Sequence, residues 1–127
     1  MKFEKIDKKS VKILMDIFYE KIRRDENLGK IFNNAIGNDD ISWEKHKEKI
    51  GNFWLGITIN EGDYVGQPLK KHLELPPFPQ EFFNIWLKLF EESLNNVYNK
   101  ENQDIFLQRA KMIANHFQNI LYRFQKS

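Results

Sequence analysis

The chain contains three histidines, His46, His72 and His116, and no cysteine. No two of these histidines are three or four residues apart, so the paired-histidine zinc site of a metalloprotease helix is excluded. His46 is in helical phase with Ile50 and Phe53 and therefore faces inward if this segment is helical. From the residues alone, a core histidine satisfied by one hydrogen bond is the more common outcome at such a position.

His72 lies in a short segment that begins at Gly66-Gln67-Pro68 and stops before Pro76-Pro77. Proline restricts both ends of this segment, which is therefore a rigid place to hold one imidazole. A neutral imidazole that donates Nδ1–H to a carbonyl leaves Nε2 available to a metal. A surface histidine is the simpler interpretation of His72, and for His116 we expect a core or boundary position.

Aromatic side chains are abundant: 11 of the 127 residues are phenylalanine and aromatics make up 14%. Tyr19 and Trp86 each add one polar group to an apolar helix face, and such a group needs a partner when it is buried. Flat, rigid side chains fill an ordinary core or line a site for a flat apolar ligand. Composition does not separate these two outcomes.

Several other classes of function are disfavoured. The sequence has no glycine-rich phosphate loop and no serine on a strand-to-helix elbow. Lys and Arg number 20 against 18 Asp and Glu, without a basic stripe, so we expect no nucleic-acid partner. The longest uncharged stretch, residues 50–60, is far shorter than the ~20 residues of a membrane span. The mixed charges of residues 1–10 predict no signal peptide, and the lack of cysteine is compatible with the cytoplasm.

The elements that must position these residues are helices. Apolar residues recur at helical spacing nearly throughout, and no stretch alternates long enough to indicate a sheet. The length suits one domain, residues 1–127, of all-α class. We predict a first helix capped by Asp7 or Ser10, a loop over 33–40, a helix from Ser42 to about residue 59, and later helices over 68–74, 80–98 and 103–124.

At this point the sequence resembles a known family. The match runs over essentially the whole chain. The telling stretches, in this order, are Ile17-Phe18-Tyr19-Glu20, residues 31–37 (IFNNAIG), residues 46–54 (HKEKIGNFW), residues 66–73 (GQPLKKHL), residues 75–79 (LPPFP) and Phe83-Asn84-Ile85-Trp86. Together they resemble the group III, or P-type, truncated haemoglobins of bacteria. The resemblance implies a globin-like fold, a two-on-two helical sandwich around haem.

The resemblance also implies a cofactor, haem b, and roles for particular residues. His72 matches the proximal iron ligand. Tyr19, His46 and Trp86 match residues of the distal, ligand-binding pocket. The remaining positions expected to contact the haem are Phe32, Ile50, Phe53, Phe90 and Ile113, with Lys49, Lys71 and Tyr64 as candidates near the propionates.

The function so implied is reversible binding of O2, CO and NO in a polar distal pocket, with slow release of oxygen. His46 has three alternatives: it bonds the ligand, swings as a gate or ligates iron. A peroxidase-like or nitric-oxide dioxygenase enzyme served by a separate reductase is an alternative function. A cofactor-free helical interaction module is a second one. We expect a cytoplasmic monomer.

Overall fold

The computed structural model describes residues 2–59 and 80–125. Within these ranges it contains five helices, α1 (Lys8–Arg24), α2 (Leu28–Ile36), α3 (Asp40–Ile59), α5 (Gln80–Val97) and α6 (Lys100–Gln125), and no extended strand. The prediction of an all-α fold is confirmed. The predicted segment 68–74, which contains Lys71 and His72, lies outside the described residues, and so does Tyr64. The side chain of His116 is also outside the described part of the structure.

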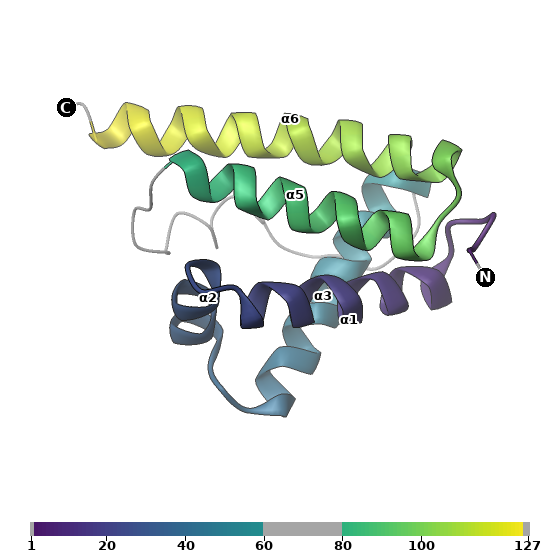
Figure 1. Cartoon of the computed structure of the whole chain (residues 1–127), viewed down its shortest axis with the longest axis horizontal. Helices are drawn as coiled ribbons and strands as arrows, with labels where there is room; N and C mark the ends of the chain where they lie inside the picture. The colour runs from purple at the N-terminus through teal and green to yellow at the C-terminus, as the bar shows by residue number, and fades with distance from the viewer. Residues whose placement is uncertain (1, 60–79, 126–127) are drawn as a thin grey trace.

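The helices pack as two pairs (Figure 1). α1 packs against α3, and α5 against α6, while further contacts of α1 with α5 and of α3 with α6 join the pairs. α2 packs beside the end of α1. The core lies between the pairs, and its largest fully buried side chains include Phe18 of α1, Trp43 of α3, Phe90 of α5 and Phe106 of α6. α1 and α3 each contact three other helices, so these two are the central elements of the fold.

The start of α1 is fixed by a capping box that joins the two predicted capping residues. The Asp7 carboxylate accepts from the Ser10 amide at 2.8 Å, and the Asp7 amide donates to the Ser10 hydroxyl oxygen at 3.0 Å. Asp7 is therefore the N-cap, whereas Ser10, the other predicted candidate, is the third helical residue. The pKa of Asp7 is lowered, chiefly by the bond from the Ser10 amide.

A buried link ties this helix start to the turn between α5 and α6. The hydroxyls of Ser10 and Tyr98 lie 2.7 Å apart, with both residues fully buried. Phe3 donates its amide to the Val97 carbonyl at 2.7 Å and accepts from the Asn99 amide at 3.2 Å. The N-terminal segment therefore holds the two helix pairs together at one end.

Three predicted boundaries were wrong. α2 continues to Ile36 through the polar stretch predicted as loop, because Gly37 takes φ +122° and ends the helix there. α3 begins at Asp40 rather than Ser42, since the Asp39 carboxylate accepts from the Ser42 amide at 2.9 Å and so acts as its cap. α6 begins at Lys100 rather than 103, directly after the α5–α6 turn.

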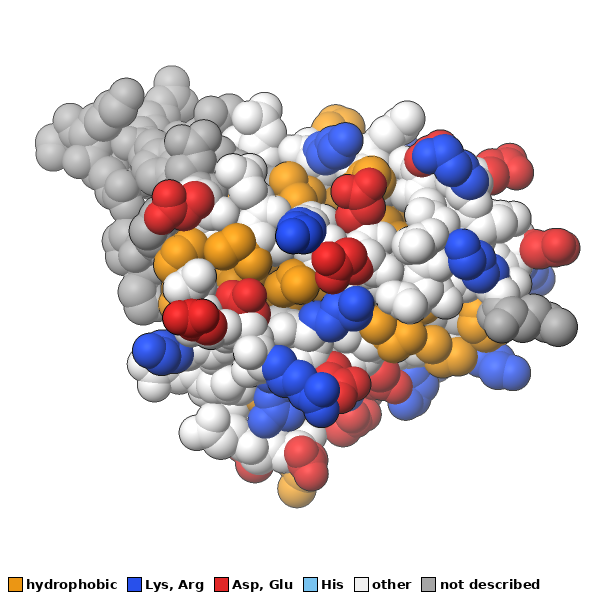
Figure 2. All heavy atoms as spheres, in the orientation of Figure 1, with side chains coloured by type: hydrophobic (Ala, Val, Ile, Leu, Met, Phe, Trp, Pro, Cys, Tyr) orange, Lys and Arg blue, Asp and Glu red, His pale blue; other side chains and the backbone are white. Residues whose placement is uncertain are grey.

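The face of the molecule shown in Figure 2 carries charges of both signs. Lys and Arg side chains alternate with Asp and Glu across the side shown in Figure 2, with apolar patches between them. Among the described residues, no helix is both long enough and apolar enough to cross a membrane. The prediction that charge is spread rather than gathered in a basic stripe is confirmed for this face.

Candidate functional site

Tyr19 and His46, predicted from the sequence as ligand-binding residues, lie in contact. Their ring centroids are 5.0 Å apart and the rings are nearly perpendicular, at 79°. Tyr19 comes from α1 and His46 from α3, so the packing of these two helices creates the pair. Tyr19 is 5% exposed, and the Nε2 atom of His46 is buried. Two polar groups are thus held side by side inside an apolar core.

Burial fixes the protonation state of the tyrosine. Desolvation raises the pKa of Tyr19 far above its usual 10, because an apolar surrounding disfavours the phenolate. The hydroxyl therefore keeps its proton at every physiological pH. Tyr19 can donate a hydrogen bond to a ligand that accepts one.

Trp86, the third predicted ligand-binding residue, joins this pair through a phenylalanine. Phe18 lies between them, with its ring centroid 5.0 Å from that of Tyr19 and 5.5 Å from that of Trp86. Trp86 is half-buried on α5 and stacks on Phe90 at 5.5 Å. The helix pairs therefore bring all three predicted residues to one aromatic cluster, although contact between Tyr19 and Trp86 themselves is indirect.

The residues expected to contact a cofactor divide into two groups. Phe32, Ile50 and Phe90 are buried, with exposures of 4%, 8% and 0%. Phe53 and Ile113 are half-buried and pack against the core. Half-buried apolar side chains recur on the same helices: Ile57 of α3, Phe82, Ile85 and Trp86 of α5, and Leu107 of α6.

This arrangement fits a haem. A porphyrin needs flat apolar walls, and hydrogen-bond donors near its iron favour a bound gas that draws negative charge. Aromatic and aliphatic side chains of α3 and α5 are suited to form such walls, and the Tyr19–His46 pair could offer the polar atoms. Among the described residues no cluster of three His, Asp or Glu could hold a free metal ion.

Sequence reasoning missed two members of the cluster. Phe18 connects Tyr19 with Trp86, as described above. Trp43 is 2% exposed and lies 5.6 Å from the Tyr19 ring and 5.8 Å from the His46 ring. Its position one helical turn before His46 was the available signal, since residues i and i+3 share a helix face.

A separate groove lies between α1 and α3. Its volume is about 270 Å³, and it contains none of the predicted haem-binding or ligand-binding residues. Val11, Met15 and Leu55 contribute apolar lining, and most of the other lining residues are charged. The predicted site is therefore distinct from this groove.

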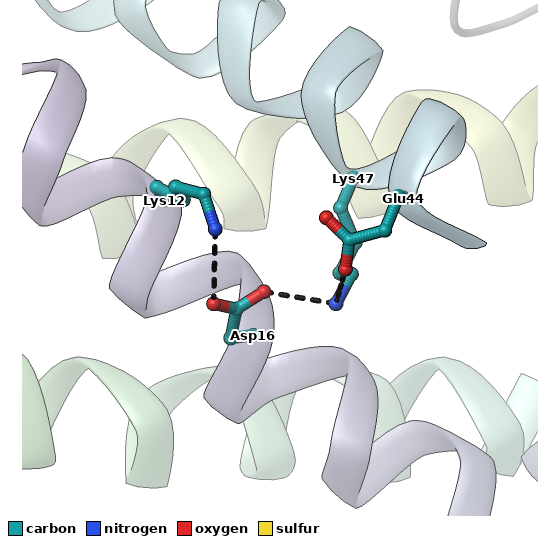
Figure 3. Close-up of polar contacts among 4 residues, drawn as sticks. All are labelled: Lys12, Asp16, Glu44 and Lys47. Atoms are coloured by element: carbon teal, nitrogen blue, oxygen red, sulfur yellow. Dashed lines mark hydrogen bonds and ion pairs between the residues drawn. The ribbon is translucent and has the colours of Figure 1, made fainter. Parts of the chain in front are cut away.

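An ion-pair network crosses between α1 and α3 (Figure 3). The Lys47 ammonium lies 2.8 Å from carboxylate oxygens of both Asp16 and Glu44, and Asp16 is also 3.6 Å from Lys12. Burial lowers the pKa of Lys47, but its hydrogen bonds to Asp16 and Glu44 outweigh this and raise it. Asp16 precedes Tyr19 by three residues and Lys47 follows His46, so the network joins the two helices beside the Tyr19–His46 pair.

Comparison with known proteins decides the family. Residues 2–119 match the model of a family described as bacterial-like globin. The chain belongs to this family. It is 68% identical over 124 residues to a group 3 truncated haemoglobin of Campylobacter jejuni, with 98% of each chain covered. It also matches the crystal structure of a group III truncated haemoglobin from Campylobacter jejuni with a TM-score of 0.93, 68% identity and 98% coverage of both chains.

Membership of this family confirms the truncated-globin fold and supports globin-type haem binding by the chain. The two packed helix pairs of the described residues are therefore those of a truncated globin. The individual site residues remain predictions. Of those in the described part, Lys49 is half-buried on α3 beside Ile50.

Proposed function

We propose that this globin binds dioxygen and other diatomic gases, CO and NO, at a haem b ligated by His72, and that it releases oxygen slowly. When bound, the haem supplies an iron with one open coordination position. The observation that carries the proposal is the buried contact between Tyr19 and His46, which places a permanently protonated phenol beside an imidazole.

The chain's own residues retain the gas. Tyr19 donates from α1, and the indole N–H of Trp86 is the second donor we expect, from α5. A hydrogen bond to an acceptor that carries negative charge contributes roughly 1.5–3 kcal/mol. Two such donors slow release by two orders of magnitude or more, since ~1.4 kcal/mol is tenfold. Dioxygen draws more charge than carbon monoxide, so it gains more from these donors.

Slow release favours consumption or scavenging of oxygen over its bulk delivery. The proposal includes a separate reductase as partner, because turnover of oxygen or nitric oxide needs electrons that this chain's side chains do not supply. It also includes a cytoplasmic monomer, with which the absence of cysteine is compatible.

Stopped-flow measurement of oxygen dissociation tests the polar pocket. Tyr19→Phe and Trp86→Leu should each accelerate dissociation by about tenfold or more and change CO dissociation less. Tyr98→Phe is the matched control, because it removes a buried tyrosine hydroxyl that bonds Ser10 rather than facing His46. Unchanged oxygen dissociation in both site variants would show that these donors do not hold the ligand.

The ferrous optical spectrum without added ligand separates the roles of His46. A five-coordinate spectrum excludes iron ligation by His46 and leaves two roles, bonding the ligand or acting as a gate. We expect this result, because His46 packs against Tyr19. A six-coordinate spectrum that becomes five-coordinate in His46→Ala indicates that His46 ligates iron.

A further inference from the structure

Trp43 is the aromatic residue that touches both members of the Tyr19–His46 pair. Its ring lies at 80° to the His46 ring and at 53° to the Tyr19 ring, with centroid distances of 5.8 and 5.6 Å. The three rings therefore form one closed set, in which each contacts the other two. The Trp43 ring therefore limits movement of the His46 ring on the side where the two are in contact.

Trp43 is itself held from two further sides. Its indole N–H donates to the Gly37 carbonyl at 2.8 Å, and Gly37 takes the positive φ that ends α2. The Arg23 guanidinium lies 4.8 Å from the centre of the Trp43 ring, a cation–π distance. Arg23 is in turn bonded to the Asn33 side chain at 3.2 Å. The indole is thus held by α1 and by the end of α2, independently of its contacts with Tyr19 and His46.

A residue that only filled the core would not need this anchoring. Trp54, on the same helix, has the same exposure of 2% and stacks on Phe90 at 4.9 Å. Within residues 2–59 and 80–125, the aromatic contacts of Trp54 are with Phe53, Phe90 and Phe106. Trp43 instead packs against two polar-tipped rings and uses its N–H in a defined hydrogen bond.

We propose that Trp43 is a positioning residue of the ligand pocket, which limits the range of the His46 ring and holds it against Tyr19. This inference rests on the proposed gas binding for its functional consequence. Trp43 acts through His46 and Tyr19. Without the indole, His46 gains room to rotate and the polar groups around a bound gas no longer adopt one arrangement.

The test compares Trp43→Leu, Trp43→Phe and the matched control Trp54→Phe in the haem-loaded protein. Infrared spectra of the CO complex resolve different polar surroundings of the ligand as separate C–O stretching bands. We expect Trp43→Leu to redistribute intensity among these bands. It should also change the oxygen dissociation rate by about threefold or more, which is a smaller effect than removing a hydrogen-bond donor to the gas. Trp43→Phe, which keeps a ring, should restore part of the wild-type pattern.

Trp54→Phe should lower the free energy of unfolding while leaving the bands in place. Bands that are unchanged in Trp43→Leu, or that move equally in Trp54→Phe, would overturn the inference. If Trp43→Leu does not fold, Trp43→Phe against Trp54→Phe makes the same comparison. The proton–proton contact between the His46 and Tyr19 rings, measured by NMR in the CO complex, should weaken only in the Trp43 variants.

This NMR measurement also separates the two proposals. If Tyr19→Phe and Trp86→Leu both leave oxygen dissociation unchanged, the polar-pocket function fails, and the positioning role is then decided by the ring contact. Loss of that contact in the Trp43 variants supports the role, and its persistence overturns it.

Discussion

The two glycines Gly29 and Gly51 should respond to the same substitution with opposite signs. Both are buried within helices, Gly29 in α2 and Gly51 in α3. Glycine in a helix is less favourable than alanine by about 1 kcal/mol, so Gly→Ala stabilises wherever a methyl group fits. Whether it fits is decided by the neighbouring atoms at each position.

At Gly51 the methyl group fits. A Cβ there would lie 3.5 Å from Val11 Cγ1 and 3.6 Å from Met15 Cγ, which are ordinary van der Waals contacts across the α1–α3 interface. Gly51→Ala should therefore raise the free energy of unfolding by about 0.5–1 kcal/mol.

At Gly29 the methyl group does not fit. A Cβ there would lie 2.6 Å from the backbone oxygen of Arg23, the penultimate residue of α1. A carbonyl in a helix cannot rotate away as a side chain does, so α2 must shift from α1. Overpacking of this kind costs about 1–3 kcal/mol, which exceeds the propensity gain. We expect Gly29→Ala to destabilise the protein by about 1–2 kcal/mol.

Urea unfolding followed by far-UV circular dichroism measures both effects. The variants must be compared in one haem-loading state, because a bound ligand adds to the stability of the folded form. In thermal unfolding, the melting temperatures of Gly29→Ala and Gly51→Ala should differ by about 10 °C for a chain of this size. A Gly29→Ala variant as stable as wild type, or a Gly51→Ala variant less stable than it, would refute the packing described for the two helix contacts.

Two further predictions concern the supports of the site. Lys47→Met and Asp16→Asn, combined in a double-mutant cycle, should show a coupling of about 0.5–1 kcal/mol, because the Lys47 side chain is only 19% exposed. For the same reason, high salt should reduce this coupling only modestly. Lys12→Met, at an exposed and longer pair, should couple with Asp16→Asn weakly, and equal coupling would contradict the role of burial. Burial raises the pKa of Tyr98 from 10 to about 12, so the stability it contributes is complete below pH 10 and is lost as the pH rises towards 12. Tyr98→Phe should therefore lose less stability over this alkaline range than wild type, and identical pH profiles in chemical unfolding would contradict this.

Helical periodicity predicted the long helices well where one face is strongly apolar. α5 ends within a residue of its predicted limit because Phe83, Phe90 and Leu94 form a clear buried stripe. The errors occurred at polar ends, where single side chains decide. The Asp39 cap makes α3 begin two residues earlier than predicted, and α2 continues through two asparagines to end at Gly37. Pattern reasoning sees neither the cap nor the positive φ.

The site was predictable only in part. Periodicity placed His46 on an inward face, and the structure confirms this through its buried Nε2. The pairing of His46 with Tyr19 is a tertiary contact between α1 and α3, so it followed from the family resemblance and not from spacing. The role of Trp43 was missed because its significance arises from Arg23 and Gly37, which approach it from other elements.

The optical spectrum of the purified, haem-loaded protein and of His72→Ala tests the central proposal most directly. We expect wild type to show a Soret band that shifts on reduction and again with O2 or CO. His72→Ala should lose this band while keeping its helical circular dichroism, and added imidazole should restore it. His116→Ala is the histidine control and should keep the band. A colourless wild-type protein, or an unchanged spectrum in His72→Ala, would contradict haem ligation by His72.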